Sequence, residues 1–138
     1  MSSRTLIAVA MWVGLAAGCV STKIRSVQSF VDFPVAGAVL VADTYSWRLV
    51  ALSGHRVDRV DDGRLSIEVR LKNLSGLDLP VEIKTVFHGA DGVVVSQDAD
   101  WRPVVIPGNS EHRYRAISDN RFAASFEVTL RTPLTRGL

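Results

Sequence analysis

The chain has 138 residues, of which 47% are hydrophobic and 22% charged, and its formal net charge at pH 7 is +2. This length accommodates a targeting segment and one domain. The absence of a clustered basic stretch argues against a nucleic-acid-binding protein.

An apolar run that ends in a cysteine begins the chain. Arg4 precedes an uncharged stretch from Leu6 to Ala17, and Gly18 and Cys19 follow it. A basic start, an apolar stretch of roughly 7–15 residues and a small-residue cleavage site define a secretory signal. A cysteine at this place is typical of bacterial lipoproteins. We therefore predict that residues 1–18 are a lipoprotein signal peptide and that Cys19 is acylated.

Two alternatives to this signal are an ordinary secretory signal and an uncleaved anchor. The apolar stretch is short for a membrane-spanning helix, which needs about 20 residues. Val20, and not an aspartate, follows the cysteine. By resemblance to enteric sorting rules, this favours the periplasmic face of the outer membrane.

Cys19 is the only cysteine. If a lipid occupies it, the mature domain has no disulfide, no cysteine nucleophile and no cysteine-based metal site. Residues 19–29 are polar and contain few large apolar groups, which predicts a flexible tether between lipid and domain. Ten extended residues reach about 35 Å at most, so the domain would stay close to the membrane.

Residues 30–138 are expected to form one domain of short strands. Apolar and polar residues alternate most clearly in 64–72, 81–87 and 124–131, the pattern of strands with one buried face. Weaker strand candidates are 47–52, 55–60, 93–96, 104–106 and 111–117. The apolar stretch 35–42 is either a first strand or a segment packed on the sheet edge. Turn residues at 61–63, 90–92 and 107–109 separate these runs, which predicts an all-β, antiparallel β-sandwich.

Histidines and carboxylates form no recognisable catalytic or metal-binding motif. His55, His88 and His112 lie far apart in the sequence and on different expected strands, so we expect surface or loop residues, although adjacent strands could bring two together. Residues 61–63 lack the further acceptors and the closing glutamate of a calcium loop. We therefore expect no catalytic residue, no metal and no cofactor.

Three aromatic residues are candidates for an interface. Tyr45 and Trp47 are two positions apart, so on a strand they would share one face. With Leu49 they would form either a core edge or an exposed strip, and an exposed strip would favour binding because Tyr and Trp recur at binding hot spots. Trp101 begins an expected strand, where a core position is favoured over a contact position.

The second half of the chain carries a recognisable series of elements. They are Asp62-Gly63, Leu65 to Asn73, Val81 to Gly92, Trp101-Arg102-Pro103 and Phe126 to Arg131. This order resembles the YcfL-like family of small, largely uncharacterised bacterial lipoproteins. The resemblance implies an Ig-like β fold and an envelope lipoprotein. Genes of that family often lie beside a lipoprotein activator of peptidoglycan synthases, which implies a link to the cell wall. Phe87-His88-Gly89 departs from the family pattern of an aromatic pair followed by Asp.

These observations favour a non-catalytic binding or scaffold module of the cell envelope. It would be held to the membrane by its N-terminal lipid and would contact an envelope protein or the wall. One alternative is an envelope hydrolase that uses histidines and aspartates brought together by folding. Another is a carrier of a small apolar ligand, which needs a cavity of about 300 Å3 or more.

Overall fold

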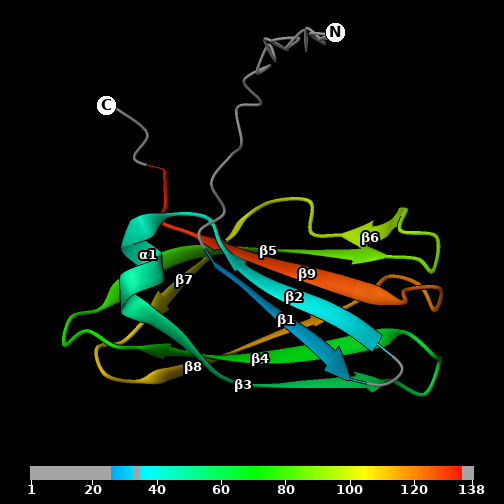
Figure 1. Ribbon diagram of the computed structural model, residues 1–138, viewed down its shortest axis with the longest axis horizontal. Helices are drawn as coiled ribbons and strands as arrows, with labels where there is room; N and C mark the ends of the chain where they lie inside the picture. The colour runs from blue at the N-terminus through cyan, green and yellow to red at the C-terminus, as the bar shows by residue number, and fades with distance from the viewer. Residues whose placement is uncertain (1–25, 33–34, 135–138) are drawn as a thin grey trace, which may run out of the picture.

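The computed structural model describes residues 26–32 and 35–134. This part of the chain folds into short strands with one helix near its start (Figure 1). In chain order the elements are β1 (Ser26–Asp32), β2 (Val35–Val41), α1 (Thr44–Leu49), β3 (Val50–Arg59), β4 (Leu65–Asn73), β5 (Leu79–His88), β6 (Val94–Gln97), β7 (Arg102–Ile106), β8 (Glu111–Ile117) and β9 (Ser125–Arg131).

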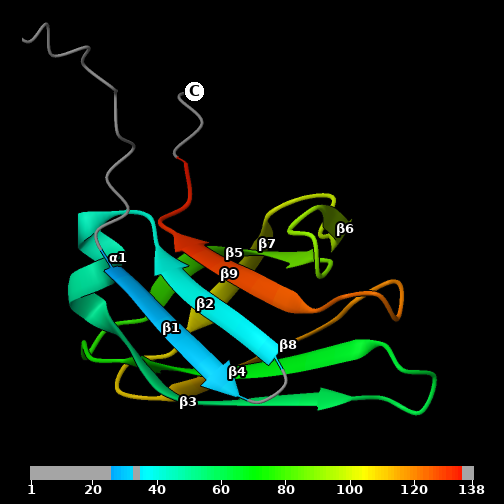
Figure 2. The same cartoon turned by 45° about the vertical axis from the view of Figure 1, so that its right-hand side comes forward.

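The strands form two sheets that face each other, with α1 at one end (Figures 1 and 2). A 6-stranded sheet has the order β1-β2-β9-β5-β6, with β7 also paired to β5, and a 3-stranded sheet has the order β3-β4-β8. This mostly-β arrangement of two sheets confirms the predicted β-sandwich in outline. The prediction was wrong in two respects, because β2 and β9 pair in parallel and α1 interrupts the strands. A parallel pair needs a long crossover connection, and the chain from β3 to β8 supplies it.

The core lies between the sheets and follows the alternation seen in the sequence. Alternate residues of β4, β5 and β9 have exposed fractions of at most 3%: Leu65, Ile67, Val69, Leu71, Leu79, Val81, Ile83, Phe87, Phe126, Val128 and Leu130. Burial of this apolar surface is the main favourable contribution to folding. The strands predicted at 64–72, 81–87 and 124–131 are therefore confirmed.

Several predicted boundaries change near the start of the domain. Residues 26–29 of the expected tether belong to β1, because the backbone pairs with β2 from Ser26 opposite Val41 onward. The ambiguous stretch 35–42 contains strand β2. Instead of two strands at 47–52 and 55–60, the chain forms α1 and then the single strand β3, which carries a bulge between Leu52 and Gly54.

The N-terminal predictions lie outside the described residues. Residues 1–18 and Cys19 precede the first described residue, so the signal peptide and the lipid site remain predictions. Within the described ranges, none of the helical structure has the length and apolar character needed to cross a bilayer.

A buried polar contact joins the two sheets inside the core. The Tyr114 hydroxyl on β8 lies 2.6 Å from Oγ1 of Thr85 on β5 and donates to Oδ2 of Asp98 at 3.0 Å. The same carboxylate oxygen accepts the backbone N–H of Thr85 at 2.8 Å. Burial raises the pKa of Tyr114 to about 12; the hydrogen bond with Thr85 lowers the pKa and the charge of Asp98 raises it further. The phenol therefore stays neutral and able to donate at neutral pH.

We predict that Tyr114→Phe lowers the free energy of unfolding by about 1–3 kcal/mol, because Thr85 and Asp98 lose a buried hydrogen-bond partner. Urea denaturation measures the change. Tyr45→Phe is the matched control, since Tyr45 is 60% exposed and should change stability by less than about 0.5 kcal/mol. Equal stabilities of the two variants would contradict this role for Tyr114.

Candidate binding surface

Helix α1 begins at a capping aspartate. Oδ1 of Asp43 accepts the backbone N–H of Ser46 at 2.8 Å, and its backbone oxygen accepts the N–H of Trp47 at 3.1 Å. Aspartate in extended conformation is a favoured N-cap, because its side chain satisfies an N–H group that the first helical turn leaves free. Ser46 is fully buried, so this turn is fixed against the sandwich.

The same carboxylate fixes α1 to the end of the last strand. Oδ2 of Asp43 accepts the backbone N–H of Thr132 at 2.7 Å, and Oδ1 accepts the Thr132 hydroxyl at 2.8 Å. The hydroxyls of Ser46 and Thr132 are 3.1 Å apart. Burial by itself would raise the pKa of Asp43, but the hydrogen bonds from Ser46 and Thr132 together hold it below its ordinary value. The ionised form of the Asp43 carboxylate therefore stabilises the attachment of α1 to the end of β9.

We predict that Asp43→Ala lowers the free energy of unfolding at pH 7 by about 1–3 kcal/mol, because the cap and the bonds to Thr132 are lost. Since the pKa of Asp43 is lower in the folded chain, protonation favours unfolding. The contribution is present above the ordinary value of 3.8 and disappears as the pH falls through the lower folded-state pKa.

Urea denaturation between neutral pH and strong acid tests this prediction. The stability gap between wild type and Asp43→Ala should close in acid. Asp61→Ala removes an exposed turn aspartate and serves as the control, with little effect expected at any pH. A gap of the same size at every pH would contradict the role of the ionised carboxylate.

Exposed apolar side chains gather around α1. Tyr45 is 60% and Trp47 43% exposed, and in the β4–β5 turn Leu74 is 56% and Leu77 78% exposed. The turn lies at the α1 end of the sandwich (Figure 1), and the N–H of Leu74 donates to the backbone oxygen of Leu49 at 2.7 Å. We call Tyr45, Trp47, Leu74 and Leu77 the α1 surface.

A small apolar pocket opens beside this surface. Its volume is about 230 Å3, and it lies where β2 and α1 meet β3 and the end of β4. The lining residues are Val39, Val41, Trp47, Val50, Ala51, Leu52, Leu71 and Leu74. Pockets for small ligands usually hold about 300 Å3 or more, so this pocket is smaller than the volume that the carrier alternative needs.

The prediction that Tyr45 and Trp47 share one face of a strand is wrong. They lie on a helix and not on a strand, and residues two apart on a helix do not share a face. Both are nevertheless exposed, because Ser46 between them is the residue that points into the protein. The signal missed in the sequence is Asp43, an N-cap residue three positions before Ser46.

Trp101 lies on the surface of the larger sheet and not in the core. It is half-buried, and the Arg131 guanidinium covers its ring at 3.8 Å from the ring centroid. Nε of Arg131 also donates to Oε2 of Glu82 at 2.8 Å. Arg102, the next residue in the Trp-Arg-Pro sequence, forms an ion pair with Asp98. These contacts give Trp101 and Arg102 structural partners on the larger sheet.

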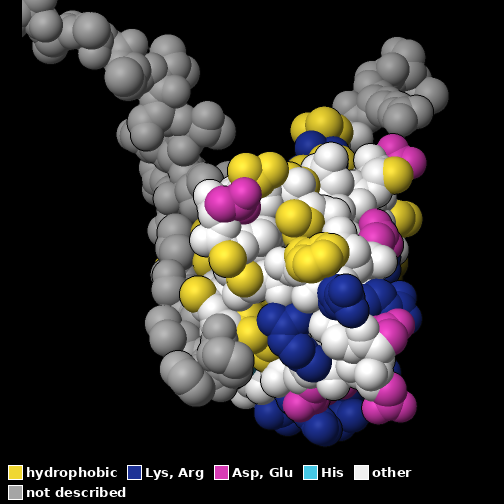
Figure 3. Space-filling view, turned by 90° about the vertical axis from the view of Figure 1, so that its right-hand side faces the viewer, with side chains coloured by type: hydrophobic (Ala, Val, Ile, Leu, Met, Phe, Trp, Pro, Cys, Tyr) yellow, Lys and Arg dark blue, Asp and Glu magenta, His cyan; other side chains and the backbone are white. Residues whose placement is uncertain are grey.

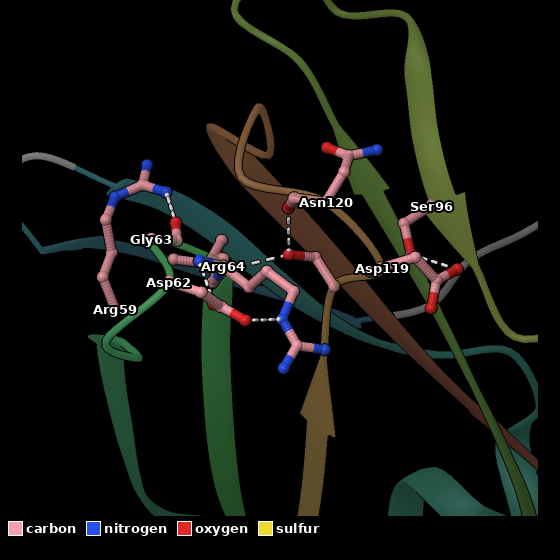
Figure 4. A network of polar contacts seen from close by, with 9 residues as sticks. Arg59, Asp62, Gly63, Arg64, Ser96, Asp119 and Asn120 are labelled. Atoms are coloured by element: carbon pink, nitrogen blue, oxygen red, sulfur yellow. Dashed lines mark hydrogen bonds and ion pairs between the residues drawn. The ribbon is translucent and has the colours of Figure 1, made fainter.

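The turns at the end of the sandwich opposite α1 contain a network of polar contacts (Figure 4). In the β3–β4 turn, Asp62 accepts the backbone N–H of Arg64 at 3.1 Å and pairs with its guanidinium at 2.7 Å. These bonds from the Arg64 backbone and side chain lower the pKa of Asp62. Gly63 has φ of 83°, which glycine adopts without strain. The turn predicted at 61–63 is therefore confirmed.

The three histidines are not brought together. His55 lies on β3, His88 on β5 and His112 on β8, so His88 is in the other sheet. Over the described residues, no three His, Cys, Asp or Glu side chains are close enough to hold a metal ion.

The comparisons agree on the class of protein, a mostly-β chain of two sheets. A crystal structure of cj0090 from Campylobacter jejuni has a TM-score of 0.58 and 20% sequence identity, covering 69% of this chain and 97% of that one. A crystal structure of a DUF1425 family member from Shewanella sp. pv-4 has a TM-score of 0.55 and 15% identity, covering 86% of this chain and all of the other. No curated protein sequence matches the chain.

The family follows from the sequence match itself. Residues 37–132 match the family described as a protein of unknown function, DUF1425. This match spans most of the chain, and the protein therefore belongs to the DUF1425 family. The matched range begins within β2 and ends just after β9, so it contains α1 and its contact with Thr132.

Proposed function

We propose that this protein is a lipid-anchored, non-catalytic binding module of the bacterial outer membrane. Acyl chains on Cys19 would hold it at the periplasmic face, and the YcfL-like resemblance supports an Ig-like sandwich with a link to cell-wall synthesis. The module works without a metal or cofactor and binds its partner through the α1 surface.

The observation that carries this proposal is the exposed apolar character of the α1 surface. Tyr45, Trp47, Leu74 and Leu77 are between 43% and 78% exposed and lie beside an apolar pocket. Clustered exposed apolar residues mark interaction sites in soluble domains, and aromatic residues dominate binding energies at such sites. The β-sandwich core holds α1 rigidly through Asp43, which favours a prearranged binding surface.

Anchoring is tested by the variant Cys19→Ala. The alanine cannot be acylated, so we predict that this variant leaves the membrane fraction while its far-UV circular dichroism stays unchanged. Fractionation of cell envelopes and mass spectrometry of the N-terminus provide the readout. A variant that remains in the membrane would show that residues 6–18 act as an uncleaved anchor.

Binding is tested by a photoreactive benzoylphenylalanine at position 45 in living cells. We predict that irradiation produces covalent adducts at position 45, because the α1 surface is occupied in the envelope. The matched control carries the same group at Asp61, an exposed position in the opposite end, where few adducts are expected. Mass spectrometry identifies the captured molecule. Equal yields at both positions would contradict a specific α1 surface.

A further inference from the structure

We propose that the partner of the α1 surface is the phospholipid bilayer that holds the acylated N-terminus. The α1 end of the domain then contacts the membrane, and the opposite end points away from it. This inference rests on the proposed function, because it requires the lipid at Cys19.

The described chain enters the domain beside α1. Ser26, the first residue of β1, pairs with Val41 at the end of β2, and α1 begins three residues later at Thr44. Figure 2 shows β1 starting beside α1 and running toward the opposite end.

Only a short length of chain joins this point to the proposed lipid. Cys19 lies seven positions before Ser26, so fully extended chain spans roughly 25 Å at most. The 9-residue strand β4 is itself about 30 Å long. A domain attached this closely meets the bilayer with the end at which its chain enters, unless it turns over on the membrane.

The side chains of the α1 surface suit a membrane interface. Tyr and Trp combine an apolar ring with one polar group, and both are enriched where membrane meets water. Leu74 and Leu77 add aliphatic side chains with exposed fractions of 56% and 78%. Together they fit the boundary between headgroups and acyl chains, where surface-bound proteins bury apolar groups.

Most charged side chains near α1 have partners within the protein, as Asp43 has in Thr132 and Lys72 in the Asn109 backbone oxygen. In α1 and in the β4–β5 and β7–β8 turns, the charged residues are Arg48 and Asp78, and Asp43, Lys72 and Glu111 flank these segments. Asp78 is occupied within the protein, because its Oδ1 accepts the N–H of Gly108 at 3.1 Å. Arg48 is exposed and is free to approach lipid phosphates, which attract basic side chains near a membrane.

The opposite end has a different composition. Figure 3 shows apolar side chains over one part of this end and mostly charged side chains over the rest. Val93 and Val94 of the β5–β6 hairpin are 61% and 46% exposed. Phe122 is 68% exposed, but Arg121 lies over its ring at 5.5 Å, and the neighbouring β3–β4 turn carries Asp61, Asp62 and Arg64. Burying these carboxylates in a membrane interface would cost free energy, so this end is better suited to the aqueous periplasm.

Tryptophan fluorescence on vesicles tests the orientation. The mature chain has two tryptophans, Trp47 and Trp101, so Trp101→Phe leaves Trp47 as the only reporter. The matched control combines Trp47→Phe, Trp101→Phe and Phe122→Trp, which moves the reporter to the opposite end. Both acylated chains are reconstituted into vesicles of phosphatidylethanolamine and phosphatidylglycerol with or without bromine on the acyl chains. Circular dichroism confirms that each is folded.

We expect brominated lipid to reduce the emission of Trp47 by about two-fold or more, since bound interfacial groups lie about 5–10 Å into the headgroup boundary. The tryptophan at position 122 should keep its emission. Quenching at position 122, or no quenching at position 47 in a chain that floats with the vesicles, would overturn the orientation while leaving the anchor intact. The orientation would also be overturned if the photoreactive group at position 45 formed its main adduct with a protein in living cells.

Failure of the anchor has a different signature. Flotation of the vesicles and the mass of the N-terminal peptide are measured before the fluorescence. A chain that carries no acyl group and does not float contradicts the proposed function, and the orientation falls with it.

Discussion

The Asp43 carboxylate is the constraint on which the binding end of this protein depends. Its two oxygens receive hydrogen bonds from the first turn of α1 and from Thr132, which lies 89 positions away in the sequence. A helix of six residues is too short to be stable by itself in water. The carboxylate therefore supplies both the start of the helix and its attachment to the sandwich, and it fixes where Tyr45 and Trp47 are exposed.

The two ends of the sandwich differ in the side chains that their turns expose. At one end, the turns satisfy their own carboxylates, as Asp62 does with Arg64, and exposed apolar side chains such as Phe122 have charged neighbours. At the other end, α1 lies across the opening between the sheets and leaves an apolar pocket and the α1 surface uncovered. The hydrophobic effect makes such a surface unfavourable in water. Contact of this end with lipid would remove the unfavourable free energy of exposing it to water.

Much of the fold could be predicted because each central strand has one buried face. The alternation in 64–72 and 81–87 located β4 and β5, and β8 was predicted at its observed bounds, 111–117. Helix α1 could not be predicted by periodicity, since it has too few residues. Local sequence patterns do not report contacts between distant parts of the chain. Such contacts include the Asp43–Thr132 bond, the parallel pairing of β2 with β9 and the contact of Arg131 with Trp101. Tyr45 and Trp47 could be named as interface candidates from the sequence. Only the fold shows that they lie beside the start of β1.

Hydrogen–deuterium exchange on the vesicle-bound protein tests the central claim most directly. The acylated chain on vesicles is compared with soluble Cys19→Ala, which has the same domain without the lipid. The account predicts slower exchange on vesicles in residues 44–49 and 74–78, because the membrane excludes water from the α1 end, and unchanged exchange in 61–64 and 119–124. Slower exchange confined to 61–64 and 119–124, or identical exchange throughout, would contradict it.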